Sequence, residues 1–259
     1  MSRFRFTVEY EGTRYSGWQV QKNARTVQGE IIGALRQVLG GDDFEFMGSG
    51  RTDAGVHAIG QVAHLEARTT LAPHILRMKV NDLLPADVNI IDVNRAAPKF
   101  HARHHAISRS YLYQICQRRT AFGKRYVWWV KDELDTEAMT AACSIFEGFH
   151  DFRSFTQDDP EAKSTTVELE LCRLHVDGPL ILINIRGSHF LWRMVRQMVG
   201  MIVECGRGAI RPESISELLH SQSSLPATKT APPSGLFLHH VQYDHEEIRP
   251  EISPLIMIR

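Results

Sequence analysis

The stretch RFRFTVEYEGTRYSGWQVQKNARTVQGEIIGALRQVLGG, residues 3–41, decides the fold class because a strand pattern and a helix pattern follow one another in it. The first part alternates between apolar and polar side chains, which predicts a half-buried strand. Thr26 can cap the helix that follows, and Gly40-Gly41 can end it. We therefore expect a strand, a loop and a helix in this order. The apolar positions behind this prediction are Phe4, Phe6, Val8 and Tyr10 in the strand and Val27, Ile31, Leu35 and Val38 in the helix.

The rest of the chain continues to mix strand and helix patterns. Some of the strands are joined by tight turns, such as Asp177-Gly178-Pro179, and others by helices, which favours an α+β fold with antiparallel sheet. A Gly-rich loop is expected to run through Gly60, and no sequence repeat at a fixed period is visible. The further strands are expected at Phe44 to Met47, through Val62 and Leu65, and at Ile107 to Cys116, Val167 to Val176 and Leu180 to Ile185. The further helices are expected at Leu71 to Leu84 with Thr70 as cap and Pro73 in the first turn, around Met139, Cys143 and Phe146 after Asp135, and at Phe190 to Glu204.

Composition indicates an ordinary globular protein, since 43% of the 259 residues are apolar and 23% are charged. The N-terminus lacks the continuous apolar core of a signal peptide, and Arg193 and Arg196 interrupt the most apolar segment. We therefore expect no membrane span and a cytoplasmic protein. The cysteines form no C-x-x-C pair that would begin a zinc or redox site, which favours structural thiols. They are Cys116, Cys143, Cys172 and Cys205.

Charge is balanced overall but unevenly spread. Thirty basic and thirty acidic residues cancel, which by itself argues against nucleic-acid binding. One stretch, however, interleaves arginine with aromatic side chains, and such a face can bind RNA on a neutral protein. Its arginines are Arg95, Arg103, Arg109, Arg118, Arg119 and Arg125, and its aromatic residues are Phe100, Tyr111, Tyr113 and Tyr126.

The segment GSGRTDAGVHA, Gly48 to Ala58, is the most unusual stretch of the chain. Its glycines allow sharp turns and close approach to a ligand, and Arg51 beside Asp53 can keep the carboxylate ionised, as a nucleophile requires. A plain loop in which Asp53 makes an Asx turn is the alternative. A phosphate-binding loop is a weaker one, because the segment lacks the Walker A lysine and no helix pattern follows it.

The same segment resembles the signature loop of the tRNA pseudouridine synthase A family. Other blocks resemble that family in the family's order, so the resemblance spans about residues 4 to 243, although the part from Gln157 to Thr166 matches weakly. Several long blocks in order are far more specific than one motif. They are YEGTRYSGWQVQ, TVQGEI, GQVAHLE, FHARHHAISRSYLY, GFHDFRSF, FLWRMVRQMVG and APPSGLFLHHVQYD.

The resemblance implies a pseudouridine synthase fold of the α+β class, with two ferredoxin-like α/β sandwiches joined through a largely antiparallel sheet and a central active-site cleft. On this view residues 1–103 form the half that carries the catalytic loop, and residues 104–259 form the half that completes the cleft. A homodimer is implied, and the substrate is a uridine at positions 38 to 40 in the anticodon stem-loop of tRNA. The family needs no metal and no organic cofactor.

The resemblance also implies roles for single residues. Asp53 resembles the catalytic aspartate, and Tyr111 the residue on which the base stacks. Arg51 resembles the arginine that displaces the base, and Arg196 one that keeps the aspartate charged. We expect Arg103, Arg109 and His57 to bind substrate with them. Tyr111 and Tyr113 share a strand face, so one of the two is expected to pack in the core.

A carboxylate can act as nucleophile or proton acceptor in the isomerisation of uridine, and an aromatic face can receive the flipped base. The residues leave open whether Asp53 attacks C1′ or C6, or promotes a glycal intermediate. Two other classes of function stay open as well. One is a non-catalytic RNA-binding protein, which would not need Asp53. The other is a metal-dependent hydrolase that uses His101, His104 and His105. Their spacing places His101 and His105 on one face of a strand and His104 on the opposite face. No carboxylate or cysteine lies at the spacing of a further metal ligand.

Overall fold

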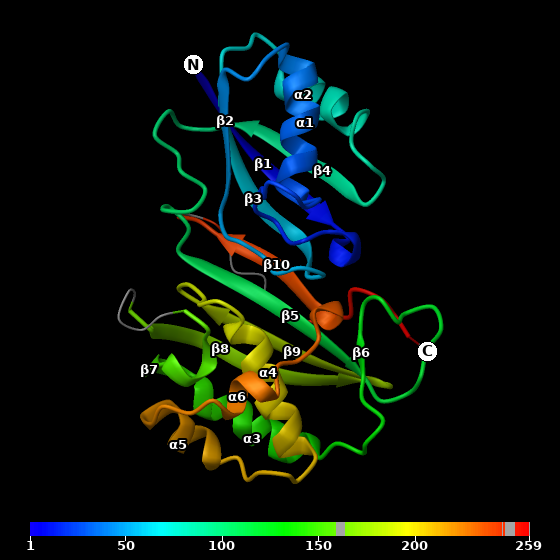
Figure 1. Ribbon diagram of the computed structural model, residues 1–259, viewed down its shortest axis with the longest axis vertical. Helices are drawn as coiled ribbons and strands as arrows, with labels where there is room; N and C mark the ends of the chain where they lie inside the picture. Colours follow the sequence, from blue (N-terminus) through cyan, green and yellow to red (C-terminus); the bar gives the residue numbers. More distant parts are fainter. Residues whose placement is uncertain (159–163, 245, 247–251, 259) are drawn as a thin grey trace. The chain divides into compact units, whose positions relative to one another are not determined.

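The computed structural model describes residues 1–158, 164–244, 246 and 252–258. The chain forms two compact units (Figure 1), which are Met1–Ile107 with Phe237–Glu247 and Ser108–Leu236 with Ile248–Arg259. The sequence-based boundary between residues 103 and 104 divides the chain into consecutive halves, and it stays a prediction. Residues 159–163 of the weakly matching segment lie outside the described residues.

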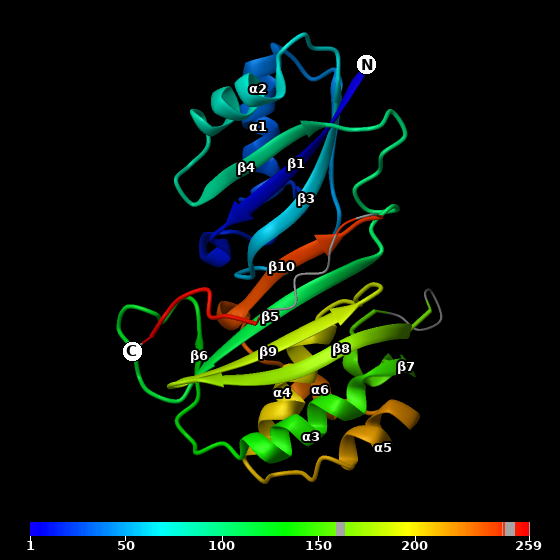
Figure 2. The ribbon, with the colours of Figure 1, turned by 180° about the vertical axis from the view of Figure 1, so that it is seen from behind.

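The first unit is built on a sheet in which β1 is central and antiparallel to both of its neighbours, β3 and β4. With β2 antiparallel to β3, the strand order is β4-β1-β3-β2, which is that of a split βαβ or ferredoxin-like unit. The helices α1 and α2 lie side by side on one face of this sheet (Figures 1 and 2). The bounds are β1 Ser2–Tyr10, the 3-10 turn η1 Gly12–Arg14, α1 Val27–Leu39, β2 Phe44–Gly48, β3 His57–Ala67, α2 Pro73–Asn81 and β4 Val88–Arg95.

The N-terminal prediction is confirmed. Side chains of β1 alternate as expected, with Phe4, Phe6 and Val8 fully buried. Helix α1 begins after Thr26, whose side chain accepts a hydrogen bond from the backbone N–H of Gly29. It ends at Gly40, whose φ of 75° is the left-handed conformation that glycine adopts most easily.

Helix α2 is shorter than predicted at both ends. The predicted cap, Thr70, is wrong, because the helix begins at Pro73 and no side chain caps it. Proline supplies the first helical residue and disfavours helical conformation in the residue before it. At the other end, Asn81 uses its side chain to bond both the N–H and the C=O of Ile90 in β4, and the helix stops there.

Strand β10, Leu236–Gln242, joins the first unit although it follows β3 by most of the chain. It runs parallel to β3, with Phe237 opposite His57 and Leu238 opposite Ala58. A Cβ on Gly60 would lie 2.4 Å from the carbonyl oxygen of His239, so this close approach requires glycine. Gly60 lies within β3, which already begins at His57. The prediction that the Gly-rich loop runs through Gly60 is wrong.

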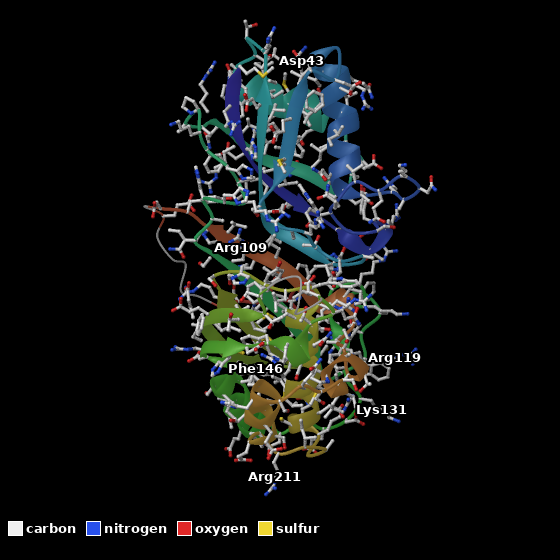
Figure 3. The ribbon with its side chains drawn as sticks, turned by 60° about the vertical axis from the view of Figure 1, so that its left-hand side comes forward. Asp43, Arg109, Arg119, Lys131, Phe146 and Arg211 are labelled. Carbon is white, nitrogen blue, oxygen red and sulfur yellow. The ribbon has the colours of Figure 1, made fainter. Side chains whose placement is uncertain are left out.

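The second unit contains a sheet in the order β5-β9-β8-β7, in which neighbours are antiparallel, and the short β6 pairs in parallel with the end of β5. Its helices cover one face (Figures 1 and 2), and Phe146 of α3, labelled in Figure 3, is buried against Phe152 and Phe155. The bounds are β5 Ser108–Cys116, β6 Trp128–Trp129, α3 Thr136–Phe146, β7 Gly148–Asp151, η2 Arg153–Phe155, β8 Thr166–Asp177, β9 Leu180–Gly187, α4 Met194–Gly206, α5 Ser214–His220, α6 Leu225–Thr228 and η3 Pro233–Gly235.

Helix α4 begins later than predicted. Arg193 has a φ of 62°, so its left-handed backbone cannot belong to the helix, which starts at Met194 instead of Phe190. The expected turn between β8 and β9 is confirmed, with Gly178 at a φ of 55°. The α+β class with largely antiparallel pairing is also confirmed, since the pairs described within the units are antiparallel apart from β3 with β10 and β5 with β6.

Two further properties bear on the sequence-based expectations. No helix in the described ranges is long and apolar enough to cross a membrane. All four cysteines are free thiols, and all four are buried.

Candidate active site

The loop between β2 and β3 presents Asp53 at a tight turn. The N–H of Val56 donates to the carbonyl oxygen of Asp53 over 3.2 Å, and Gly55 has a φ of 78°. Thr52 and Val56, on either side of the turn, are buried, whereas Asp53 is half-buried and Arg51 is exposed. The carboxylate thus stands on a turn whose flanking residues belong to the core.

Residues 10–18 form the support of this loop. The N–H of Trp18 donates to the carbonyl oxygen of Thr52 over 3.1 Å, and the hydroxyl groups of Tyr10 and Thr52 lie 2.8 Å apart. Gly17 has a φ of 87°, and a Cβ there would lie 2.4 Å from the same carbonyl oxygen of Thr52. Glycine is therefore required at this position for both conformation and space.

The start of the loop is held by a buried polar pair. The hydroxyl of Ser49 donates to the side-chain oxygen of Gln61 over 2.7 Å, and the amide nitrogen of Gln61 donates to the carbonyl oxygen of Gly50 over 3.1 Å. Ser49 and Gln61 are almost completely buried. Hydrogen bonds in such surroundings specify one arrangement, because a lost partner leaves a buried polar group unpaired.

His57 lies inside the support of the loop. Its ring is 1% exposed and stacks on Phe237 with the ring centroids 4.8 Å apart. Its Nδ1 accepts a hydrogen bond from the N–H of Gly12 over 3.0 Å, and Glu11 Oε1 lies 3.6 Å from the same nitrogen. These contacts connect η1, β3 and β10, and a contact of His57 with substrate stays a prediction.

In the second unit, Tyr111 and Arg109 of β5 both contact the segment after β9. Tyr111 is 9% exposed, and its ring packs edge to face on Phe190 with the centroids 5.0 Å apart. Arg109, labelled in Figure 3, donates to the carbonyl oxygen of Ser188 over 2.9 Å. Burial and the positive charge of Arg109 lower the pKa of His189 in the same segment. The packing on Phe190 and the low exposure of Tyr111 restrict the orientation of its ring.

Arg196 of α4 is tied to the chain that leads to β10. Its Nε donates to the carbonyl oxygen of Ala231 over 2.8 Å, and the N–H of Ala231 donates to the carbonyl oxygen of Arg196 over 3.0 Å. The packing is so close that a Cβ on Gly200 would lie 1.7 Å from the carbonyl oxygen of Lys229. Arg196 is thus a positioned arginine and not a freely moving one at the rim of the helix.

Tyr113 is the packing member of the tyrosine pair. It is completely buried, and its hydroxyl donates to the carbonyl oxygen of Pro232 over 2.7 Å. Burial raises the pKa of Tyr113 well above its usual value, an effect that the nearby charge of Arg196 partly opposes. Tyr113 thus packs in the core, as one of the two tyrosines was expected to, and Tyr111, at 9% exposed, is also buried.

The comparison with known families decides the class of protein. A family model described as tRNA pseudouridine synthase matches residues 7–104 and 142–244. The chain belongs to the tRNA pseudouridine synthase family. As a member of this family it is an enzyme, an isomerase of the RNA pseudouridine synthase class. The family resemblance seen in the sequence blocks is therefore confirmed.

Relatives match this synthase over nearly the whole chain. A tRNA pseudouridine synthase A of Moorella thermoacetica is 38% identical over 247 residues, which are 94% of this chain and 100% of the relative. The protein of the same name from a Geobacillus species is 40% identical and covers 94% of this chain and 99% of its own. That of Aquifex aeolicus is 39% identical and covers 93% of this chain and 99% of its own.

The histidines near Arg103 form a turn in the synthase, so the predicted strand alternation is wrong. Nδ1 of His101 accepts hydrogen bonds from the N–H groups of Arg103 and His104, and the carbonyl oxygen of His101 accepts from the N–H of His105. Arg103 is exposed at this turn. In the part of the chain that the structure describes, no three His, Cys, Asp or Glu side chains are grouped to hold a metal.

The predicted site residues of the synthase are divided between the units. Arg51, Asp53, His57 and Arg103 belong to the first unit. Arg109, Tyr111 and Arg196 belong to the second. The residues that support these side chains were not identified from the sequence. They nevertheless lie in the sequence blocks that resemble the family. The supporting residues are Tyr10, Gly17, Trp18, Gln61, Phe190 and Ala231.

Proposed function

We propose that the enzyme converts uridine to pseudouridine at positions 38 to 40 in the anticodon stem-loop of tRNA, with Asp53 as the catalytic carboxylate. The observation that carries the proposal is the placement of Asp53, half-buried on a turn between the buried Thr52 and Val56. A catalytic group needs a supporting shell that limits its movement. The relatives named tRNA pseudouridine synthase A support tRNA as the substrate.

The proposed reaction consumes no second reactant. The bond between N1 and C1′ of the uridine breaks, the base turns while it stays bound, and C5 bonds to C1′. C5 loses its proton and N1 gains one, so the atoms balance. Asp53 acts as nucleophile or proton acceptor. Attack at C1′, attack at C6 and a glycal intermediate all fit this role.

Three further residues complete the proposed catalytic set. Tyr111 receives the flipped base on its ring, which offsets part of the few kcal/mol that flipping costs. Its packing on Phe190 supports this role, because a fixed ring loses little freedom when a base stacks on it. Arg51 takes the place of the displaced base, and Arg196 keeps the carboxylate charged.

The proposal includes substrate contacts, assembly and location. Arg103 and Arg109 bind the phosphate backbone near the uridine, and His57 contributes to substrate binding through the loop that it supports. We also propose a homodimer in the cytoplasm that uses no metal and no organic cofactor.

Mapping pseudouridine in the anticodon arm of tRNA after incubation with Asp53→Asn and Asp53→Ala tests the function. We expect wild-type protein to form product at positions 38 to 40 and both variants to form none while they still bind tRNA. Asp43→Asn is the matched control, because Asp43 is an exposed carboxylate in the same unit and is labelled in Figure 3. It should retain full activity.

Each of the other outcomes contradicts a defined part of the proposal. Product formed by Asp53→Ala removes Asp53 from the mechanism. Product that appears only outside positions 38 to 40 overturns the proposed specificity. Binding of tRNA by the wild-type protein without product in any tRNA would favour a non-catalytic role, and activity that chelator abolishes would favour metal chemistry.

A further inference from the structure

The segment from Gln117 to Lys131, which we call the basic segment, follows β5 in the second unit. Its sequence QRRTAFGKRYVWWVK contains five Lys and Arg residues and neither Asp nor Glu. These five side chains are exposed, and Phe122 and Trp129 are 99% and 44% exposed. The basic side chains are Arg118, Arg119, Lys124, Arg125 and Lys131.

The basic segment has a defined backbone. Gly123 is packed so closely against Ile258 that a Cβ there would lie 2.6 Å from Cδ1 of that residue. The side-chain amide of Gln114 in β5 donates to the carbonyl oxygen of Tyr126 over 2.9 Å. The N–H of Val130 donates to the carbonyl oxygen of Cys116 over 3.1 Å. A ligand that binds here therefore meets side chains on a surface that is already formed, which lowers the entropy cost of binding.

The first acidic side chain after the basic segment pairs with an arginine outside the segment. Asp132 lies 2.7 Å from Nε of Arg207, an arginine that also bonds Glu204. Arg119 lies over the ring of Trp129, 5.8 Å from its centroid, and Figure 3 shows Arg119 and Lys131 on the same side of the unit. Arginine and lysine beside exposed aromatic rings are the combination with which proteins bind RNA backbones and unpaired bases.

The basic segment lies some distance along β5 from the residues proposed to hold the uridine. From Tyr111 to Cys116 the strand extends roughly 17 Å, at about 3.3 Å per residue. That length corresponds to about five base-pair steps of a nucleic-acid helix. An RNA that reaches from Tyr111 to the basic segment must therefore extend several base pairs beyond the reacting nucleotide.

We propose that the basic segment binds phosphates of the tRNA that lie several base pairs away from the reacting uridine, with Phe122 and Trp129 as apolar contacts. The proposal rests on the proposed function for the position of that uridine at Tyr111. A second copy of the chain is a poorer partner, because two copies of the basic segment that face each other repel. RNA phosphates provide the complementary charge.

The test measures the affinity of the full-length variant Arg119→Glu/Lys124→Glu for two RNAs. One is an intact tRNA, and the other is an anticodon stem-loop that keeps only the two base pairs next to the loop. We expect a loss of about tenfold or more for intact tRNA, with a salt dependence whose slope is smaller by about 2, since each lost phosphate contact removes about 0.9. The trimmed stem-loop should lose less than about threefold. Arg119→Lys keeps the charge and should stay close to wild type for both RNAs.

A matched control variant reverses two positive charges that lie outside the basic segment. Lys79 of α2 and Arg211, the latter labelled in Figure 3, are exposed in the first and second unit. Lys79→Glu/Arg211→Glu should change the affinity for intact tRNA less than Arg119→Glu/Lys124→Glu does. Equal losses in the two double variants overturn the proposal, because they would reflect net charge alone.

Two other results also overturn it. One is an equal loss for intact tRNA and trimmed stem-loop, which places the contact next to the uridine. The other is a change of oligomeric state by light scattering with unchanged tRNA affinity, which assigns the surface to a second copy. Failure of the proposed function is a different observation, because it appears as missing product at positions 38 to 40 in the wild-type protein whatever the variants bind.

Discussion

The hydroxyl groups of Tyr10 and Thr52 lie 2.8 Å apart and join the last residue of β1 to the residue before Asp53. This contact is buried. It links the central strand of the first unit directly to the loop that carries the proposed catalytic carboxylate.

Removal of this hydroxyl should affect catalysis more than stability. We expect Tyr10→Phe to lower the free energy of unfolding by about 1 kcal/mol, the usual net value of one hydrogen bond. It should lower kcat roughly tenfold, because small displacements of a catalytic group are costly. Tyr15→Phe is the control, since the Tyr15 hydroxyl bonds Asp87 instead of the loop. If both variants lose the same activity, the Tyr10 contact does not position Asp53.

Two glycines should respond in opposite directions to the same substitution. Gly17→Ala forces a Cβ to within 2.4 Å of the Thr52 carbonyl oxygen at a φ of 87°, so we expect a loss of stability of about 2 kcal/mol and near-complete loss of activity. Gly33 lies within α1 with open space around its Cβ position, so Gly33→Ala should stabilise the protein by up to about 1 kcal/mol. Urea unfolding with an activity assay measures both. A stable, active Gly17→Ala variant would contradict the close packing of the loop.

The hydroxyl of Tyr111 can also move a proton at C5 or C2′ of the uridine, and two substitutions separate this role from stacking. We expect Tyr111→Phe to keep the affinity for tRNA but to lower kcat about 100-fold, which is a usual loss when a general acid or base is removed. Tyr111→Ala should lose the stacking surface as well. Single-turnover kinetics with saturating enzyme distinguishes the two. Full activity of Tyr111→Phe would limit the residue to stacking.

Acid should destabilise the first unit through His64. Burial lowers the pKa of His64 from 6.5 to about 4, with His101 and Arg3 acting in the same direction and Glu45 opposing them. Between these values the unfolded chain binds a proton that the folded chain does not, so stability is complete above pH 6.5 and falls as the pH decreases towards 4. The loss is about 1.4 kcal/mol per pH unit for this group.

Urea unfolding at pH 7 and pH 5 measures this effect. His64→Asn is the informative variant, because its oxygen can accept the hydrogen bond that Nδ1 of His64 receives from the N–H of Ala102 over 3.2 Å, but it does not titrate. Its stability should fall less between the two pH values than that of the wild type. The pKa of His101 is also lowered by burial, so part of the acid sensitivity should remain. Equal slopes for both proteins would exclude His64 as the source.

Much of the local structure follows from short-range rules. The alternation in β1 and the capping of α1 by Thr26 and Gly40 are correct because each depends on neighbours within a few residues. The predicted extent of α2 is wrong, because its ends are not set by the helical pattern of apolar residues. Its helical pattern continues past both ends, but Pro73 sets the start and the bonds of Asn81 to β4 set the end.

In the candidate site, too, some features follow from the local sequence and others depend on distant contacts. The segment GSGRTDAGVHA indicated Asp53 and Arg51 as candidates, and the family resemblance indicated Tyr111, without any knowledge of contacts. What orients them was not predictable, because the partners are distant in the chain. Gly17 approaches Thr52, and Ala231 receives the hydrogen bond of Arg196. No local pattern marks a residue for a partner that lies far along the sequence.

The sequence by itself determined the family, the class of reaction and the elements whose hydrogen bonds close within a few residues. Only the tertiary structure decided that β10 pairs with His57 and Ala58 of β3, that His57 is buried, and that Arg193 leaves the helix before Met194. The physical reason is that long-range pairing and packing depend on the shape of the whole folded chain. A segment's own side chains set its preferences, but the contacts with distant residues determine which preference is realised.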